Sequence, residues 1–261
     1  MERKKFYKPR PKEDNMIFGM RAVIEAIDAG TVIDKIFMKN DLGGDLSKEL
    51  MQRVADRGIV VQRVPLEKLN RLTRKNHQGV VAFISPVPYY RVEQILPTLF
   101  EEGCVPFFLV LDSITDTRNF GALARTADCA GVDAIIIPER GSVSVTPEAV
   151  KTSAGALFHI PVCREKNLGQ CLRWLRESGV RVVGASEKAS DDYTAVDYTV
   201  PVAVVMGAED VGISPEALKE CDALAAIPML GNIGSLNVSV AGGVLMYEVV
   251  RQRLADGFSN S

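Results

Sequence analysis

Residues 227–253 read IPMLGNIGSLNVSVAGGVLMYEVVRQR, and this stretch says more about the fold than any other part of the chain. It begins as a loop punctuated by proline and glycine and ends as a long apolar segment, in which Val240 and Val244 are four residues apart. That spacing predicts the buried face of a helix. Ser235 and Asn237 therefore lie where a loop enters a helix, a position that offers free backbone N–H groups and favours short polar side chains.

Taken alone, this stretch is equally well explained by an ordinary helix cap followed by a core helix. A second segment, residues 109–138, reads LVLDSITDTRNFGALARTADCAGVDAIIIP. It predicts a strand, a polar loop, a helix from about Asn119 to Ala130 and a second strand. Asn119 is expected at the junction of loop and helix, and Arg125 inside the helix. Each of the two, taken singly, is explained by a cap or a surface cation.

A third segment, residues 202–215, reads VAVVMGAEDVGISP. A buried strand ends abruptly in Gly207 and Glu209, and a further glycine follows at Gly212. Glycine-rich exits from the carboxyl ends of strands are where α/β sheets bind ligands. No Gly-Lys-Ser/Thr follows and no GxGxxG occurs in the chain, so the usual phosphate-binding fingerprints are excluded.

In this order, the three segments closely resemble the motifs of the SpoU/TrmH family of RNA ribose methyltransferases, within the SPOUT superfamily. The matching stretches are NFGALARTA at 119–127, MGAEDVGIS at 206–214 and IPMLGNIGSLNVSVAGG at 227–243. The resemblance covers roughly residues 105–255, and the three-part pattern is far more specific than any one piece. It implies an α/β fold with a mostly parallel sheet and a deep trefoil knot. The knot could not have been predicted from the residues alone.

Two N-terminal stretches extend the resemblance to one branch of the family, the RlmB-like branch. GMRAVIEAI at 19–27 and NHQGVVAF at 76–83 resemble its small α/β RNA-binding domain, which is similar to a ribosomal protein. The branch methylates a guanosine ribose of large-subunit (23S) ribosomal RNA. The expected organisation is a flexible basic arm at 1–14, an RNA substrate-binding domain at 15–88, a linker at 89–103, a SpoU-type methyltransferase domain at 104–256 and a tail at 257–261.

The expected elements of the first domain are helices at 20–29, 46–57 and 66–72 and strands at 33–38, 59–63 and 80–85. Those of the second include strands at 107–111, 134–137, 160–162, 180–185, 202–206 and 224–227, with helices between them. Strands that alternate with helices indicate a parallel sheet.

Composition bounds the class of protein. With 47% hydrophobic and 25% charged residues, the chain is typical of a soluble globular protein. No apolar run approaches the ~20 residues of a membrane span, and the basic N-terminus lacks the apolar core of a signal peptide. Five cysteines without a CxxC and only two histidines argue against a disulfide framework and a zinc site. We expect a cytoplasmic protein with no metal and with reduced cysteines in or near the core.

The charge is distributed unevenly. Residues 1–90 hold 17 Lys and Arg against 11 Asp and Glu, whereas residues 91–261 hold 14 against 22, which together give the net charge of −2. This uneven charge predicts that the N-terminal third binds a polyanion. Within it, a basic run before a strand is the expected RNA contact, although such runs are often solvated loops; it comprises Arg71, Arg74, Lys75, Asn76 and His77.

The resemblance also implies the chemistry. S-adenosyl-L-methionine is the expected methyl donor and the ribose 2′-OH the acceptor, without a metal. The expected cofactor contacts are Met206, Gly207, Ile227, Met229, Leu230 and Leu236. The expected catalytic residues are Asn119, Arg125, Glu209, Ser235 and Asn237. A charged guanidinium has no acceptor, so we assign Arg125 first to gripping phosphate and only second to removing the hydroxyl proton.

Three alternatives stay open from the sequence. The same enzyme could act on transfer RNA or on another ribosomal site. A non-catalytic RNA-binding assembly factor is a second alternative, which the presence of all five polar motif residues disfavours. A nucleotide-binding α/β enzyme unrelated to RNA is a third, disfavoured by the missing phosphate fingerprints. The family also implies a homodimer, with ribosomal RNA or its precursor particle as the partner and no membrane.

Overall fold

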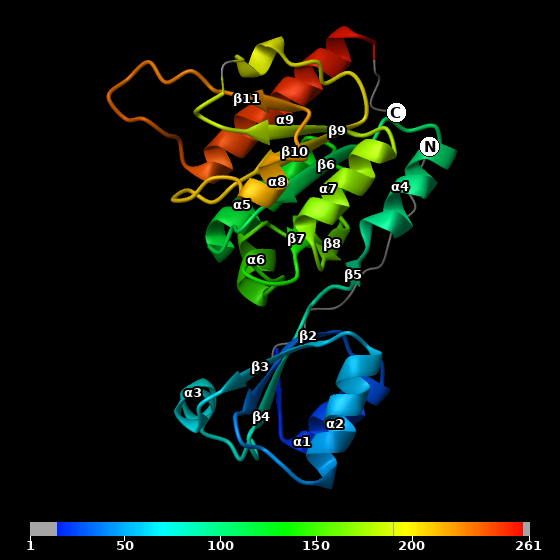
Figure 1. The fold of residues 1–261 in the computed structure, drawn as a ribbon, viewed down its shortest axis with the longest axis vertical. Coiled ribbons are helices and arrows are strands. Elements are labelled where there is room, and N and C mark those ends of the chain that lie inside the picture. Colours follow the sequence, from blue (N-terminus) through cyan, green and yellow to red (C-terminus); the bar gives the residue numbers. More distant parts are fainter. Residues whose placement is uncertain (1–14, 190, 258–261) are drawn as a thin grey trace. The chain divides into compact units, whose positions relative to one another are not determined.

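The computed structural model describes residues 15–189 and 191–257 of the chain. The basic arm expected at 1–14 and nearly all of the tail expected at 257–261 lie outside this part. The described chain separates into two compact units: a smaller one that holds residues 15–88 and 144–147, and a larger one that holds 89–143, 148–189 and 191–257 (Figure 1). Each unit has its own sheet and its own core.

The smaller unit contains a four-stranded mixed sheet in the order β1-β4-β2-β3. The strands are β1 (Met16–Phe18), β2 (Ile33–Lys39), β3 (Val60–Val64) and β4 (Val80–Ile84), and the helices are α1 (Met20–Asp28), α2 (Asp45–Asp56) and α3 (Leu66–Leu72). β4 pairs antiparallel with both β1 and β2, while β2 and β3 are parallel. The short strand β1 was not predicted, because three residues are too few to show a period.

Side chains alternate across this sheet and build two apolar clusters. On one face, α1 and α2 pack against Ile36, Met38, Val80 and Ala82. On the other face, a smaller cluster of Phe37, Val64, Val81 and the α3 residue Leu69 is flanked by partly buried Phe18 and Phe83. The two faces are therefore covered unequally, by two helices of 9 and 12 residues on one side and one of 7 residues on the other.

The larger unit is built on a seven-stranded sheet in the order β11-β9-β10-β6-β7-β8-β5. Every neighbouring pair in it is parallel. The strands are β5 (Tyr89–Tyr90), β6 (Phe107–Leu111), β7 (Ala134–Pro138), β8 (Val162–Glu165), β9 (Arg181–Ala185), β10 (Val202–Met206) and β11 (Ala223–Ala225). The central strands β6 and β10 are buried along their whole length, which explains their unbroken apolar sequences. The mostly parallel α/β fold is confirmed.

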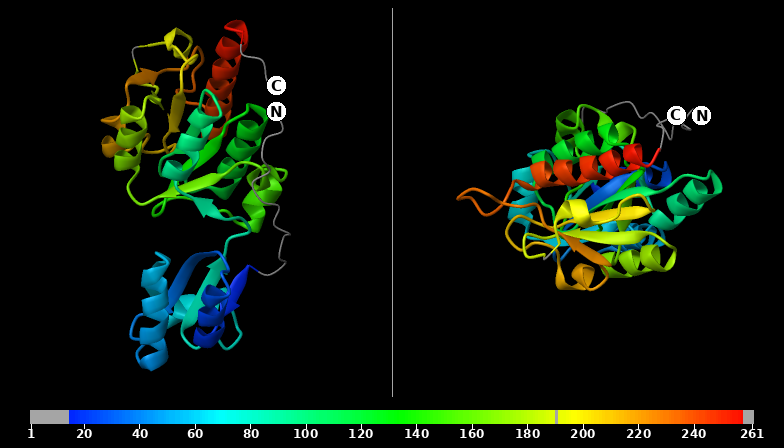
Figure 2. Two further views of the ribbon diagram at one scale, coloured as in Figure 1. Left: turned by 90° about the vertical axis from the view of Figure 1, so that its right-hand side faces the viewer. Right: turned by 90° about the horizontal axis from the view of Figure 1, so that it is seen from above.

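Helices cover both faces of this sheet. They are α4 (Val92–Glu101), α5 (Thr117–Cys129), α6 (Pro147–Thr152), α7 (Leu168–Glu177), α8 (Pro215–Leu218) and α9 (Val238–Ala255), with short 3-10 turns at Ala156–Phe158 and Tyr193–Ala195. α4, α7 and α8 share one core cluster with Phe108, Val110 and Val205 of the sheet. In Figure 2, the red helix α9 lies on one face of the sheet and the yellow-green helix α7 on the other.

Several element bounds differ from those predicted. α5 begins at Thr117 rather than near Asn119, because Asp116 is its cap and accepts from the N–H groups of Arg118 and Asn119. The strand predicted at 160–162 lies at Val162–Glu165, after Pro161, which has no N–H to give to a ladder. The last strand ends at Ala225, two residues earlier than predicted.

The segment at 89–103, expected to be a linker, belongs to the larger unit and forms β5 and α4. A buried carboxylate holds it in place. Glu165 of β8 accepts from the Val92 N–H (2.8 Å) and pairs with the Arg91 guanidinium (2.7 Å), whose other Nη atom donates to the Arg164 carbonyl (2.6 Å). Burial raises the pKa of Glu165, while the Val92 N–H and the Arg91 charge oppose that rise. The larger unit therefore includes the chain from Tyr89 onward to Val143.

In the described part of the chain, no helix is both long and apolar enough to cross a membrane. The trefoil knot implied by the family resemblance stays a prediction.

Arg91→Ala is expected to destabilise the larger unit by about 2 kcal/mol, because the buried Glu165 carboxylate loses its ionic partner while Arg91 itself is partly exposed. Urea unfolding followed by the fluorescence of Trp174, the single tryptophan, measures this. The matched control is Arg118→Ala, which removes an exposed pair with Glu148 and should cost less than about 0.5 kcal/mol. Equal effects of the two substitutions would contradict the role of Glu165.

Candidate active site

Three segments that are far apart in the sequence meet at the carboxyl end of the large sheet. Asn119 lies in the first turn of α5, which follows β6. Glu209 lies in the loop after β10, the strand that pairs with β6. Asn237 is the N-cap of α9, and its side chain accepts from the Ser239 N–H (3.0 Å). The residue types that the sequence singled out are therefore brought to one place.

One carboxylate oxygen joins the three segments. Oε1 of Glu209 accepts hydrogen bonds from Nδ2 of Asn237 (2.7 Å), Nδ2 of Asn119 (3.2 Å) and the backbone N–H of Val238 (3.2 Å). Nδ2 of Asn237 also donates to Oδ1 of Asn119 (3.1 Å). We call Asn119, Glu209 and Asn237 the amide–carboxylate cluster. Its hydrogen bonds fix which way each amide faces, since both Nδ2 atoms point at the same acceptor.

Close packing of two helices brings the cluster together. A Cβ atom on Gly242 of α9 would lie 2.4 Å from the Leu123 side chain of α5, so these helices touch where α9 has no side chain. Asn119 meets Asn237, Leu123 meets Gly242, and Thr126 meets Gly243 further along. The two helices therefore run in the same direction with their N-termini side by side. The positive ends of both helix dipoles face the Glu209 carboxylate.

The loop after β10 has an equally tight shape. Ala208 and Gly212 exchange two backbone hydrogen bonds (3.2 and 2.8 Å). A Cβ atom on Gly207 would lie 2.1 Å from the carbonyl carbon of Gly212, so only glycine fits there. The buried Asp112 at the end of β6 anchors the far side of the loop by accepting from the Ser214 N–H (2.7 Å). Gly207 is thus required by the loop itself, whatever it binds.

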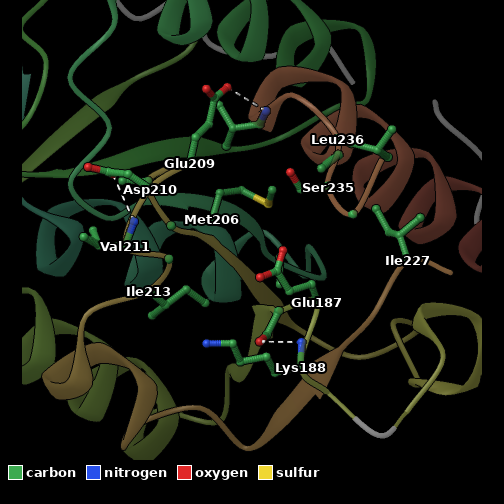
Figure 3. A pocket seen from close by; sticks show the side chains of 18 of the residues that line it. Glu187, Lys188, Met206, Glu209, Asp210, Val211, Ile213, Ile227, Ser235 and Leu236 are labelled. Carbon is green, nitrogen blue, oxygen red and sulfur yellow. Dashed lines mark hydrogen bonds between the residues drawn. The ribbon is translucent and has the colours of Figure 1, made fainter. Parts of the chain in front are cut away.

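Beside the cluster is a pocket of about 290 Å³ that opens at the carboxyl ends of β9, β10 and β11. Of the expected cofactor contacts, Met206, Gly207, Ile227, Met229 and Leu236 line it, and so do the expected catalytic residues Glu209 and Ser235. Figure 3 shows Met206, Ser235 and Glu187 pointing toward the same space. The walls combine aliphatic and thioether side chains with the backbone of the glycine loop, which suits a ligand with both apolar and polar edges.

One wall of this pocket was not predicted from the sequence. Residues 185–188, Ala-Ser-Glu-Lys, comprise the last residue of β9 and the three after it, and they line the pocket together with the motif residues. Among the described residues, the Glu187 carboxylate and the Lys188 ammonium form no side-chain hydrogen bond or ion pair, so both are free to meet a ligand. The available signal was the position of β9, because a predicted strand that ends in Ser-Glu-Lys delivers polar groups to the same edge as β10.

Other predicted residues lie outside the pocket. Leu230 is 98% exposed and is not one of the lining residues, so its side chain forms no wall there. Asn119 and Asn237 are not lining residues, but both are hydrogen-bonded to Glu209, which is one. Arg125 is exposed on α5, two turns beyond Asn119, and has no hydrogen bond or ion pair to any described residue. Its guanidinium is therefore available to a ligand.

In the smaller unit, the predicted RNA contacts separate into two groups. Arg71, Arg74 and Lys75 are exposed. His77 is buried: its Nδ1 accepts from the Gly79 N–H (3.0 Å), so its Nε2 carries the proton and donates to Oδ1 of Asn70 (2.9 Å). The ring shapes the turn into β4, and we do not retain His77 among the RNA contacts.

The cysteines also differ in part from expectation. Cys163 and Cys171 are buried in the core, where burial raises the pKa of both thiols, and burial raises that of Cys221 to about 11. Cys104 and Cys129 are exposed, contrary to the prediction that all five lie in or near the core. Within residues 15–189 and 191–257, no group of three or more His, Cys, Asp or Glu side chains is arranged to hold a metal ion.

Fold and site together define a class of RNA methyltransferases. Residues 106–247 match the model of the SpoU rRNA methylase family, and residues 16–90 match that of the RNA 2′-O ribose methyltransferase substrate-binding domain. The chain belongs to the SpoU rRNA methylase family. It is 36% identical over 242 residues to a putative TrmH family tRNA/rRNA methyltransferase, YacO, of Bacillus subtilis, which covers 93% of this chain and 97% of the relative.

Solved structures give the same result. The fold is similar to that of an AdoMet-bound rRNA methyltransferase from Sinorhizobium meliloti, with a TM-score of 0.59 and 32% identity over 94% of this chain and 88% of the other. It is also similar to the SpoU methyltransferase AviRb from Streptomyces viridochromogenes in complex with AdoMet, with a TM-score of 0.58 and 25% identity over 92% and 90%.

Gly207→Ala is expected to destabilise the larger unit by at least about 2 kcal/mol, because the new methyl group would overlap the Gly212 backbone, which cannot move as a flexible side chain can. Gly234→Ala is the matched control, since a Cβ atom there meets nothing within 4 Å and should change stability by less than about 0.5 kcal/mol. Both are measured by urea unfolding. Near-equal stabilities would show that the loop is not closed as described.

Proposed function

We propose that this chain transfers a methyl group from S-adenosyl-L-methionine to the ribose 2′-OH of a guanosine in 23S ribosomal RNA. The single observation that carries methyl transfer is the amide–carboxylate cluster at the edge of the pocket, formed by one residue from each of three family motifs. The guanosine and the ribosomal target rest on the resemblance of residues 15–88 to the substrate-binding domain of the RlmB-like branch.

The pocket suits the proposed cofactor. An adenosine is largely apolar with a few polar edges, which matches the walls of Met206, Ile213, Ile227 and Leu236 and the backbone of the Gly207 loop. When bound, S-adenosylmethionine supplies a methyl group on a positively charged sulfur. The residues holding it would be those of the β10–α8 loop, the 227–237 loop and the wall at 185–188. The volume of about 290 Å³ is close to the lower limit of about 300 Å³ for small-molecule pockets.

The protein residues would act mainly by positioning. Alignment of two reactants lowers the barrier by several kcal/mol without acid–base chemistry. Glu209 holds Asn119 and Asn237 in fixed orientations, and Asn237 at the same time begins α9. Ser235, exposed at the pocket edge, would contact the target nucleotide.

Arg125 would hold the RNA. Its guanidinium is exposed and has no partner among the described residues, so it can bind a phosphate with two parallel hydrogen bonds. A second role would be removal of the 2′-hydroxyl proton, which requires the neutral form because the charged guanidinium has no acceptor. Gripping phosphate is therefore the role assigned here.

A homodimer is part of the proposal. Large apolar side chains are exposed on the 226–237 loop and on one side of α9, among them Leu230 (98%), Ile233 (78%), Tyr247 and Val240. The prediction that Val240 lies on the buried face of this helix was therefore wrong. Figure 1 shows this loop, in orange, extending from the body of the larger unit. Exposed apolar groups gathered on one loop and one helix are typical of a protein interface.

We also propose a cytoplasmic location.

Transfer RNA is the second candidate substrate, since the Bacillus subtilis relative is named as a tRNA/rRNA methyltransferase. A non-catalytic RNA-binding assembly factor is the candidate of another class. It is disfavoured because the five polar motif residues are all present and three of them form one hydrogen-bonded cluster.

Arg125→Ala is expected to keep cofactor binding and to lower the methylation rate about 100-fold or more. The reason is that the guanidinium is proposed to bind an RNA phosphate and not the cofactor. Arg125→Lys, which keeps the charge without the bidentate geometry, should retain part of the activity. Calorimetric titration with S-adenosylmethionine and a tritium transfer assay measure the two effects. Arg176→Ala on α7 is the control, and normal turnover of Arg125→Ala would remove this residue from the site.

Deletion of residues 1–88 is expected to preserve the larger unit and its cofactor binding and to abolish methylation of RNA. The cut falls before β5, so it leaves the seven-stranded sheet complete. Circular dichroism, titration with the cofactor and the transfer assay test the three statements. Full activity of the truncated protein would show that RNA is recognised by the larger unit alone.

The deciding experiment incubates the purified protein and labelled S-adenosylmethionine with unmodified 23S ribosomal RNA and, in parallel, with transfer RNA. A single 2′-O-methylguanosine in ribosomal RNA supports the whole proposal. If only transfer RNA is labelled, the proposed methyl transfer is supported and the proposed ribosomal substrate is wrong. Absence of cofactor binding favours the assembly factor.

A further inference from the structure

The face of the small sheet that carries α3 combines aromatic and basic side chains. Strand pairing places Phe18 beside Val81 and Val81 beside Phe37, while Phe83 pairs with Lys35 in the next row. Phe37 and Phe83 meet edge to face, with ring centroids 5.7 Å apart. We call the surface formed by Phe18, Phe83, Lys35, Lys68 and Lys75 the lysine–phenylalanine face.

This face is only partly covered. The apolar residues of α3, Leu69 and Leu72, pack with Phe37, which is 7% exposed, whereas Phe18 and Phe83 stay partly exposed. α1 and α2 pack on the opposite face of the sheet. Two aromatic rings are thus accessible on a rigid sheet, where a flat ligand can reach them.

Lysine side chains lie over these rings. Lys75 Nζ is 5.0 Å from the centre of Phe18, and Lys35 Nζ is 5.7 Å from that of Phe83. Lys68 Nζ is 4.8 Å from the centre of Phe37. Such contacts are weak at exposed positions, so a ligand that offers an anion to the lysine and a flat surface to the ring can replace them.

The distribution of charge favours binding of a polyanion to the lysine–phenylalanine face. α3 and the loop after it, residues 66–77, carry four basic residues and one acid, Glu67. α1 and α2 on the opposite face carry three basic residues and five acids. The buried Asp34 carboxylate is 3.9 Å from Lys35, and counting both residues still leaves five basic residues against two acids. The positive charge lies where the rings are.

We infer that the lysine–phenylalanine face binds a single-stranded segment of the RNA substrate, with bases stacked on Phe18 and Phe83 and phosphates held by Lys35, Lys68 and Lys75. This inference rests on the proposed action on RNA. It adds which surface of the smaller unit binds the RNA and that the bound segment is single-stranded. Stacking requires bases that are not paired inside a duplex, and the lysines follow a backbone without reading sequence. An acidic peptide would use the lysines but has no need of the rings.

The test uses the full-length protein and a fluorescein-labelled single-stranded adenosine dodecamer, with binding followed by anisotropy over a range of salt concentrations. Phe18→Leu combined with Phe83→Leu keeps apolar volume and removes the aromatic faces. We expect it to raise Kd about tenfold or more without changing the salt dependence. Lys35→Gln, Lys68→Gln and Lys75→Gln together should raise Kd and lower the slope of log K against log salt by about 2.

Matched controls are Phe100→Leu, an exposed phenylalanine of α4, and Lys48→Gln on α2, whose side chain is 83% exposed. Both should bind the dodecamer as the wild type does. Wild-type affinity in the double phenylalanine variant, or an acidic peptide that competes equally with both proteins, overturns the inference. If that variant does not fold, ultraviolet cross-linking of the wild type decides: cross-links at Phe18 or Phe83 support the face, and cross-links confined to other residues overturn it.

The outcome is separable from that of the proposed function. A wild-type protein that binds the dodecamer through this face but transfers no methyl group would overturn the methyltransferase proposal alone. A protein that methylates RNA while both sets of variants keep normal affinity would overturn this inference alone.

Discussion

The site depends on one carboxylate oxygen. Glu209 Oε1 accepts from two asparagine amides and one backbone N–H, and these donors come from chain segments that are 90 and 28 residues away. A single hydrogen bond contributes only about 1 kcal/mol, but an acceptor shared by three donors also fixes their mutual geometry. The start of α5, the loop after β10 and the start of α9 are thereby held as one unit.

That arrangement is possible because backbones approach closely at two glycines. Gly242 lets α9 lie against Leu123 of α5, so that the two helix N-termini are adjacent, and Gly207 lets the β10 loop fold back on Gly212. A Cβ atom at Gly207 would overlap the Gly212 backbone, and one at Gly242 would require the Leu123 side chain to move. The glycines of the motifs therefore act through packing, and the polar residues act through the positions that this packing gives them.

The two units present surfaces of different chemistry. The larger unit presents a pocket at the carboxyl ends of parallel strands, where loops can change without disturbing the buried sheet. The smaller unit presents rings and lysines on a sheet face that one short helix leaves partly open. Arg91 and Glu165 hold the start of α4 in the larger unit against β8.

The sequence by itself determined the family and the alternation of strands and helices, and it predicted polar site residues in three motifs, because apolar periodicity and spaced motifs are local properties of a chain. It misplaced the start of α5, since Asp116 and Asn119 are both good caps and only the folded backbone shows which one is used. It did not reveal the wall at 185–188 or the burial of His77, because each depends on which strands become neighbours. The tertiary structure alone decided that Asn119, Glu209 and Asn237 share one acceptor, since hydrogen bonds between distant segments exist only after the sheet and helices have packed.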